Sequence, residues 1–340
     1  MSEGCNPVKA SVIILTYNQE KTVGRAIESV LRQKCKYPFE ILVADDDSPD
    51  ATRRVAQEYA ERYPDIVRLM PKLPNRGLVG NYFDAFEECR GEYIGDCAGD
   101  DEWLDESRLQ KQIEALDADK KLSAVFTDVE EYQILPDGEV KVSLHSDRPD
   151  RKRWMRKERI RGYDIMVGAL NHERSLPFTL SAALYRKNSL KVLMEKDATS
   201  IRMPEMGVED VPVIAALGRS GDVGFLPIVG YRYYVDGESV SNNLSYEKEY
   251  RFYQRVLRGV GHITRSLQLD PALISDHVSL KLSHIAAQAR HAGRKEWIHE
   301  IRQTAKELGV KLPLRARIHL LLLRLQSGKS GNPKKSGIPR

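Results

Sequence analysis

The first 130 residues alternate between short apolar blocks and longer segments in which apolar residues recur at helical spacing. The short blocks are rich in β-branched residues, which is typical of strands buried on both faces of a parallel sheet. They lie at residues 10–15, 39–44, 67–70, 93–94 and 122–127. The amphipathic segments between them predict helices near residues 22–32, 51–63, 80–89 and 106–116. Strands that alternate with helices in this way predict a mostly parallel sheet with right-handed crossovers.

The hydrophobic pattern changes in the second half of the chain. Residues 132–144 alternate loosely around Pro136-Asp137-Gly138 and predict a hairpin. Further strands are expected at residues 178–185 and 222–235. Residues 246–308 show only helical periodicity, so this region is expected to be helical throughout.

The C-terminal segment combines apolar and basic residues. Residues 312–325, LPLRARIHLLLLRL, predict a helix that either lies in a membrane interface and attracts anionic lipid or packs on the rest of the protein. Residues 327–340 are rich in Gly, Ser, Pro and Lys and are expected to be disordered.

Composition and charge limit the class of protein. The 340 residues are 41% hydrophobic, which suits a soluble globular protein, and no apolar run approaches the roughly 20 residues of a membrane span. The N-terminus has no apolar signal core, and four cysteines without metal-like spacing indicate free thiols in a reducing cytoplasm.

The net charge of +4 is uneven, because residues 311–340 hold eight Lys or Arg and no acid, which leaves −4 on the rest. This distribution argues against a nucleic-acid-binding body and leaves an anionic surface as a partner for the tail.

Polar clusters follow three of the predicted strands. They are Thr16-Tyr17-Asn18, Asp45-Asp46-Asp47 and Asp100-Asp101. Ligands of open α/β sheets bind beyond the carboxyl ends of the strands, so the three clusters together predict a site. For Asp100 and Asp101 the alternative is a helix N-cap.

Neither GxGxxG nor GxxxxGK[ST] follows the first strand, which disfavours a dinucleotide fold and a P-loop. Carboxylates can instead accept hydrogen bonds from a base and a ribose, while a divalent cation neutralises a diphosphate.

Three stretches resemble the successive motifs of family 2 glycosyltransferases: SVIILTYNQEKTVGRAIESVLRQ, FEILVADDDSPDAT and NRGLVGNYFDAFEECRGEYIGDCAGDDEWL. The resemblance is strongest over residues 8–120. It implies the GT-A fold, an α/β fold whose Rossmann-like, mostly parallel sheet carries a mixed acceptor-side extension and here a helical C-terminal region. The expected divisions are a nucleotide-sugar-binding half, an acceptor-binding half, a helical region and a basic tail, at residues 1–128, 129–243, 244–326 and 327–340.

The resemblance also implies a reaction, in which a sugar passes from a nucleotide diphosphate donor to a hydroxyl acceptor, usually with inversion and with Mg²⁺ or Mn²⁺. Donor-binding positions then fall on Thr16, Tyr17, Glu20, Asp46, Asn75, Arg76 and Asp100. Asp100 matches the metal-binding acid of the family's DxD motif, and Asp101 is a second candidate ligand. Ala98 replaces the first acid of the motif, so ribose contact or metal affinity is expected to be weaker. Asp96 lies too far along an extended strand to replace it.

A second acidic pair, Glu209-Asp210, opens a predicted helix. The pair can act as a helix cap. The resemblance instead places the family's catalytic base at Asp210, and one carboxylate on the acceptor side suffices to take the acceptor's proton. Glu209 is the alternative base.

For the other basic residues, the sequence gives less support for a role in a binding site. Residues 151–161 contain seven basic residues, and a solvated surface is favoured over an anionic acceptor or membrane contact. Arg186 matches a basic strand end of the family, and Arg232 with residues 239–242 resembles its loop over the donor phosphates.

The resulting hypothesis is a cytoplasmic glycosyltransferase, peripheral at the inner face of the membrane through its C-terminal basic segment. It would act in surface polysaccharide or glycoconjugate synthesis on a glycan or lipid-linked acceptor. Two alternatives remain: Ala98 favours a catalytically silent scaffold that binds sugar nucleotides, and a nucleotidyltransferase would also use an acidic α/β rim. The second lacks a lysine- and glycine-rich phosphate loop.

Overall fold

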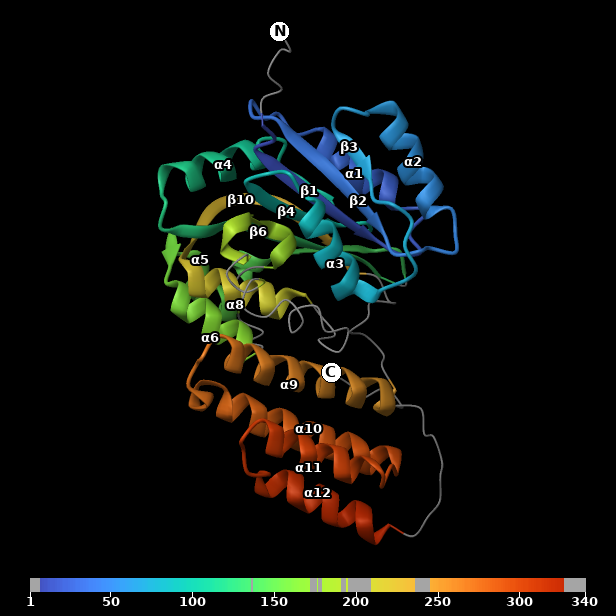
Figure 1. Ribbon diagram of the computed structural model, residues 1–340, viewed down its shortest axis with the longest axis vertical. Helices are drawn as coiled ribbons and strands as arrows, with labels where there is room; N and C mark the ends of the chain where they lie inside the picture. Colours follow the sequence, from blue (N-terminus) through green and yellow to red (C-terminus); the bar gives the residue numbers. More distant parts are fainter. Residues whose placement is uncertain are drawn as a thin grey trace.

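A ten-stranded mixed sheet forms the body of the protein (Figure 1). The computed structural model describes residues 7–135, 137–171, 176, 179–190, 194, 209–235 and 245–326. The strands are β1 (Ala10–Thr16), β2 (Phe39–Asp45), β3 (Val67–Leu69), β4 (Tyr93–Ala98), β5 (Glu102–Trp103), β6 (Leu122–Ile134), β7 (Val140–Leu144), β8 (Arg159–Ile160), β9 (Ala183–Arg186) and β10 (Asp222–Tyr234). The α-helices are α1 (Val23–Leu31), α2 (Thr52–Arg62), α3 (Gly77–Glu88), α4 (Arg108–Ala118), α5 (Pro149–Met155), α6 (Gly162–Leu170), α8 (Asp210–Ser220), α9 (Tyr246–Ser266), α10 (Ser275–Ala292), α11 (Trp297–Glu307) and α12 (Leu314–Leu325).

The strands follow the order β3-β2-β1-β4-β9-β6-β10-β5, with β7 paired to β6 and β8 to β10. β1 pairs in parallel with β2 and β4, β2 with β3, and β6 with β10. β9 is antiparallel to both of its neighbours, β4 and β6, and separates the two parallel groups. The predicted mostly parallel α/β sheet with a mixed extension is therefore confirmed.

Each face of the sheet carries its own apolar core. One core joins the sheet to α1, α2 and α4 and includes Val23, Ile27 and Ile113. The other joins it to α3, α6 and α8 and includes Phe83 and Ile214. Successive strand residues point to opposite faces, so strands such as β1 supply both cores and are almost wholly buried.

Helices α9 to α12 extend away from the sheet as a bundle, with α12 at the far end (Figure 1). The second core continues into this bundle as far as Leu323. Within the bundle, the ring of Tyr250 stacks on Trp297 with centroids 3.9 Å apart. The bundle and the sheet thus share one continuous apolar core.

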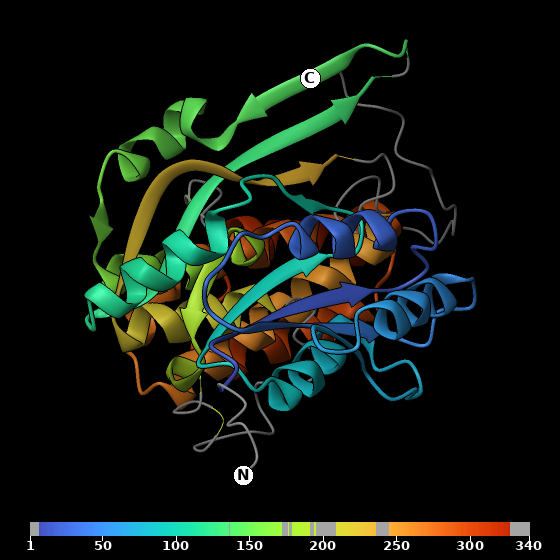
Figure 2. The same ribbon diagram turned by 90° about the horizontal axis from the view of Figure 1, so that it is seen from above.

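The hairpin predicted at residues 132–144 is formed by β6 and β7, which extend beyond the body of the protein (Figure 2). Gly138 has φ +85°, and the amide of Leu135 donates to the carbonyl of Glu139 at 2.8 Å. β6 runs without interruption to Ile134, so the expected division at residue 128 falls inside a strand.

Three local predictions need correction. The strand expected at residues 178–185 is instead a 3₁₀ turn, η2 (Leu180–Ala182), followed by β9; residue 178 lies outside the described residues. α3 begins at Gly77, three residues early, because Gly77 at φ +72° lets the chain turn into the helix there. Residues 102–103 form a strand, so the helix after Asp100-Asp101 begins only at Arg108.

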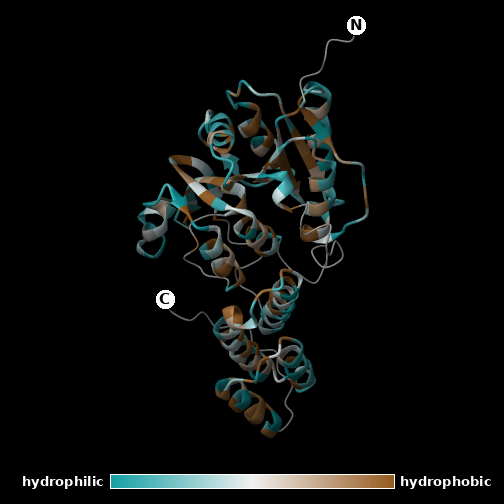
Figure 3. Ribbon diagram, turned by 60° about the vertical axis from the view of Figure 1, so that its left-hand side comes forward, coloured by the Kyte–Doolittle hydropathy of each residue, from teal (hydrophilic) through white to brown (hydrophobic). Residues whose placement is uncertain are grey.

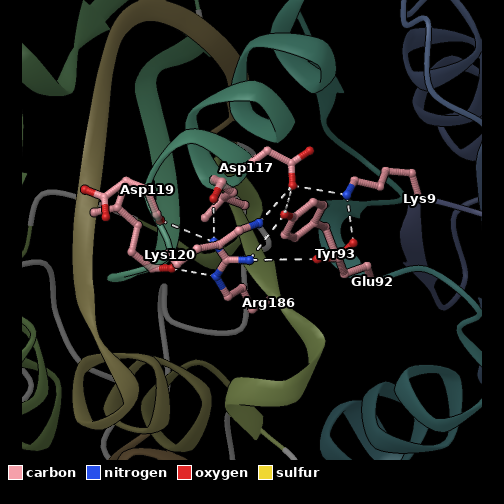
Figure 4. Close-up of polar contacts among 9 residues, drawn as sticks. Lys9, Glu92, Tyr93, Asp117, Asp119, Lys120 and Arg186 are labelled. Carbon is pink, nitrogen blue, oxygen red and sulfur yellow. Dashed lines mark hydrogen bonds and ion pairs between the residues drawn. The ribbon is translucent and has the colours of Figure 1, made fainter.

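Arg186 holds the amino-terminal ends of β4 and β6 to the end of α4 (Figure 4). Its guanidinium donates to the carbonyls of Leu116, Leu122 and Asp119 and, at 3.2 Å, to the hydroxyl of Tyr93. The Tyr93 hydroxyl in turn donates to Asp117 at 2.6 Å, and Lys9 pairs with Asp117 and Glu92. This cluster lies at the sheet edge opposite the carboxyl ends of β1, β2 and β4, so Arg186 has a structural role.

Replacing Arg186 with glutamine is expected to destabilise the protein by about 2–4 kcal/mol, because bonds to several partly buried carbonyls are lost. Urea denaturation followed by circular dichroism measures the change. Arg54→Gln is a matched control, since Arg54 forms an exposed i,i+4 pair with Glu58 and should cost less than about 0.5 kcal/mol. Equal effects of the two substitutions would contradict the structural role.

Candidate active site

The polar clusters that follow β1, β2 and β4 meet at one edge of the sheet. Thr16 is the register partner of Asp45, and Leu15 is the partner of Ala98. The amide of Asp46 donates to the carbonyl of Thr16 at 3.0 Å, and that of Gly99 donates to Leu15 at 2.9 Å. Backbone hydrogen bonds therefore tie all three strand exits into a single rim.

The loop before α3 folds onto Asp46. The side-chain amide of Asn75 donates to the carbonyl of Asp46, and the backbone amide of Arg76 donates to its Oδ1, both at 2.8 Å. Asp46 is buried, whereas the Arg76 side chain is half-exposed, with Nε 3.3 Å from Asp84. The structure thus brings Asp46, Asn75 and Arg76 together.

Tyr17 and Glu20 occupy the loop after β1 but differ in their surroundings. Tyr17 is 52% exposed, so much of its side chain is accessible to a ligand. Glu20 Oε2 accepts from the amide of Ala51 at 2.9 Å, and the Glu20 amide donates to Asp50 at 3.1 Å. Glu20 therefore joins this loop to the start of α2, and one of its two carboxylate oxygens is already engaged in that contact.

Two buried side-chain oxygens lie close against Gly99. Thr16 Oγ1 and Gln19 Oε1 are buried and have no hydrogen-bond partner within the described residues. A Cβ atom at Gly99 would stand 2.4 Å from Gln19 Oε1 and 2.8 Å from Thr16 Oγ1. Only glycine lets the main chain pass this close to both oxygens, so residue 99 fixes the path of the chain into Asp100.

Asp100 and Asp101 are adjacent but face different surroundings. The backbone carbonyl of Asp100 accepts from the guanidinium of Arg25, and Asp100 is partly exposed at the rim. Asp101 is buried; its Oδ2 accepts from the hydroxyl of Tyr231, and its Oδ1 accepts from the amide of Tyr234 at 2.8 Å. Both oxygens of Asp101 thus hold β10 in place, and the helix-cap alternative for the pair is wrong, because a strand follows them.

Burial, with the charge of Asp100 as a second cause, raises the pKa of Asp101 to about 7, although the bonds from Tyr231 and Tyr234 oppose the shift. A group enclosed in this way is poorly placed to bind a cation directly. Asp100 is the better candidate of the two.

A network of charged residues supports the Asp100 loop, and of its members the sequence had pointed only to Arg232. The guanidinium of Arg25 lies 3.8 Å from the centroid of the Tyr234 ring and 3.7 Å from Glu102. Arg232 pairs with both Glu102, at 3.1 Å, and Glu130. Arg232 is therefore engaged in β10, and residues 239–242, which were expected to act with it, lie outside the described residues.

The acidic pair Glu209-Asp210 stands at the start of α8, and its charges act on Asp96 of β4. Asp96 of β4 is buried, and neither of its carboxylate oxygens has a partner within the described residues. Burial and the charges of Glu209 and Asp210 hold the pKa of Asp96 well above its usual range. Burial likewise raises the pKa values of Glu209 and Asp210, and the charge of Asp210 adds to the shift of Glu209. The charges of the candidate base and its neighbour therefore act on Asp96 of β4, the strand that leads to Asp100.

Three of the seven basic residues at 151–161 have partners within the protein. Arg151 donates to the ring of the buried His145, Arg159 pairs with Asp119 and Asp222, and Arg161 pairs with Asp164. This favours the solvated structural surface over an anion-binding site, because these cations already have partners.

Among the residues that the structure describes, side chains that could hold a metal by themselves are not gathered at this edge. Over the described ranges, no three His, Cys, Asp or Glu side chains are grouped as metal ligands. A cation held by one carboxylate and two phosphate oxygens does not need such a group.

The sheet order, with a polar rim at the carboxyl ends of β1, β2 and β4, is that of a GT-A fold. The chain belongs to glycosyl transferase family 2, because the sequence profile of that family matches residues 11–191. An uncharacterized protein of Mycobacterium tuberculosis is 38% identical over 116 residues, 34% of each chain. EpsE of Bacillus subtilis is 35% identical over 119 residues, 35% of this chain and 42% of that protein. The dolichyl-phosphate β-glucosyltransferase of Mus musculus is 34% identical over 116 residues, 31% of this chain and 36% of that protein.

The alignments span about a third of the length of these curated relatives. Solved structures share the fold over most of this chain. S. aureus TarS superimposes with a TM-score of 0.54 at 18% identity, over 92% of this chain and 50% of that one. GalNAc-T7, solved with UDP, GalNAc and Mn²⁺, gives a TM-score of 0.54 at 15% identity, over 90% of this chain and 55% of that one.

Proposed function

We propose that this protein transfers a sugar, with inversion, from a nucleotide diphosphate donor to a hydroxyl acceptor, with the help of Mg²⁺ or Mn²⁺. The observation that carries the proposal is the single rim formed by Thr16, Asp46 and Asp100 at the carboxyl ends of β1, β2 and β4. The three residues come from separate parts of the chain, and backbone hydrogen bonds fix their positions.

The donor's nucleoside would lie over the exits of β1 and β2. The exposed ring of Tyr17 offers a stacking face for a base, and the carboxylate of Asp46 can accept from a base N–H or a ribose hydroxyl. Asn75 and Arg76 hold Asp46 from the other side. Glu20 would contribute indirectly, by fixing the loop that carries Tyr17.

Asp100 would hold the divalent cation together with the donor diphosphate. The cation supplies charge neutralisation to the departing nucleotide diphosphate. Arg25 donates to the Asp100 carbonyl and so keeps this loop in place. Because residue 98 is alanine, the carboxylate of Asp100 would bind the cation without a second acid at that position.

Asp210 would act as the catalytic base. An inverting transfer needs one acceptor-side carboxylate, which removes the hydroxyl proton as that oxygen attacks the anomeric carbon. A pKa raised by burial makes Asp210 a better proton acceptor than an exposed aspartate. Glu209 is the alternative at this position.

The biological setting is proposed from the relatives. The name of one relative, the dolichyl-phosphate β-glucosyltransferase, supports a lipid-linked acceptor. We propose a glycan acceptor as the alternative, and a role in surface polysaccharide or glycoconjugate synthesis. We place the reaction in the cytoplasm, at the inner face of a membrane.

A thermal-shift screen of nucleotide diphosphate sugars, with and without Mn²⁺, tests the proposal. A true donor at a hundredfold excess over its Kd should stabilise the protein by about 2.7 kcal/mol, and the matching nucleoside monophosphate should show no Mn²⁺ dependence. Failure of every donor to bind would refute the proposal. Donor binding without transfer to any acceptor would instead favour the silent scaffold that Ala98 suggests.

A further inference from the structure

Helix α12 has two apolar faces, of which only one is buried. Ala316, Leu320 and Leu323 are at most 2% exposed and pack against the rest of the bundle. Their spacing of four and three residues places them on one side of the helix. The packed helix that was one of the two sequence interpretations is therefore present.

The opposite side of α12 is also apolar but faces solvent. Leu314, Ile318, Leu321 and Leu325 are between 47% and 73% exposed. At about 100° per residue, these four side chains fall within a narrow stripe that points away from the buried side. Figure 3 shows apolar residues along α12 at this end of the protein. A helix that packs through one side normally presents polar residues on the other, so this stripe indicates an interaction surface.

Basic residues border the exposed stripe. By helical geometry Arg317 and Arg324 lie along one edge and Arg315 along the other, and all three are exposed. No acidic residue follows Glu307 in the sequence. The surface is thus an apolar stripe between cationic edges, which complements lipid tails below anionic headgroups.

We propose that the exposed face of α12, defined by Leu314, Ile318, Leu321 and Leu325, docks on an anionic phospholipid bilayer. The helix lies in the plane of the interface, with these four side chains among the acyl chains and its arginines at the headgroups. Its 12 residues span about 18 Å, which is short of the roughly 30 Å of a bilayer core. No described helix is long and apolar enough to cross a membrane.

The position of α12 suits this contact. It lies at the end of the bundle farthest from the sheet, so a flat surface can reach it without meeting the rim (Figure 1). The inference does not rest on the proposed donor, metal or base, because binding to lipid is measured without sugar transfer.

Sedimentation of the full chain with vesicles tests the docking surface. The protein should bind vesicles of phosphatidylcholine with phosphatidylglycerol, and should not bind phosphatidylcholine alone. Arg317→Gln with Arg324→Gln should weaken binding about twenty-five-fold, at about a factor of five per cation. Leu314→Ser, Ile318→Ser and Leu321→Ser should each weaken it about tenfold, because each removes apolar area from the acyl region.

Matched controls are available on the same bundle. Leu280 of α10 is 61% exposed, so Leu280→Ser removes a comparable leucine outside the stripe. Arg255→Gln with Arg302→Gln removes two exposed cations from other helices. Both controls should bind as the unaltered chain does, and all variants should keep its helical circular dichroism.

Two results would overturn the proposal. One is equal sedimentation of the stripe variants and the unaltered chain. The other is a dimer in light scattering that Leu321→Ser converts to a monomer, because a second copy would then cover the stripe.

Discussion

Replacing Asp210 with asparagine is expected to abolish sugar transfer while leaving donor binding intact. The amide has nearly the shape of the carboxylate but cannot accept the acceptor's proton, so the loss falls on the chemical step. Removal of a general base typically costs about 10²–10⁴-fold in turnover. Initial rates of transfer and calorimetric titration with the donor measure the two effects separately.

The pH dependence of turnover should agree with this role. Burial holds the pKa of Asp210 above that of an ordinary aspartate, and only the ionised form can accept a proton. Turnover should therefore be present above the raised pKa and be lost as the pH falls through it. In the asparagine variant, this acidic limb should be absent from any residual activity.

Glu209→Gln is the matched control, since Glu209 neighbours Asp210 and shares its partly buried position at the start of α8. It should bind donor and retain most of its turnover. If Glu209→Gln loses transfer and Asp210→Asn keeps it, the roles of the two acids are reversed. Full activity of both variants would remove the pair from catalysis.

The rim was predictable because its signals are local. Buried strands can be recognised in a sequence as apolar runs. When such strands are parallel, the polar residues at their carboxyl ends lie at the same edge of the sheet. Thr16, Asp46 and Asp100 could therefore be grouped before any contact between them was known.

The contacts that hold the rim in place were not predictable, because they join residues that are far apart in the sequence. Asp101 accepts from Tyr231 and Tyr234, some 130 residues later, and this turns a candidate ligand into an anchor for β10. Arg25 gives no local signal, since its contacts with Asp100 and Tyr234 exist only after the sheet has formed. The periodicity of β9 likewise cannot reveal that it inserts antiparallel between β4 and β6.

The surroundings of the C-terminal helix α12 also could not be predicted from its sequence. Its sequence allowed either packing on the protein or contact with a membrane. The structure shows that one side is packed and the other exposed, so the two interpretations are compatible. A count of apolar residues cannot separate two opposite stripes unless the neighbours of the helix are known.

Replacing Asp100 with asparagine is expected to abolish the Mn²⁺-dependent part of nucleotide diphosphate binding. The asparagine side chain can still fill the space, but its neutral amide is a weak ligand for a hard cation. Loss of outer-shell partners alone lowers metal affinity about 10–100-fold, so the loss of a direct ligand should cost at least about a hundredfold. Because Ala98 offers no second carboxylate, this chain has little to compensate for the loss.

The substitution Asp101→Asn tests whether Asp101 is a metal ligand or a structural anchor of β10. Its Oδ atoms accept from Tyr231 and Tyr234, so this substitution should lower the melting temperature yet preserve the Mn²⁺ dependence of binding. Isothermal titration of each folded variant with UDP and with GDP, at matched concentrations with and without Mn²⁺, distinguishes the two outcomes. Unchanged Mn²⁺-dependent binding in Asp100→Asn would show that the cation is held elsewhere. A selective loss of that binding in Asp101→Asn would assign the ligand to the residue that the structure places as an anchor.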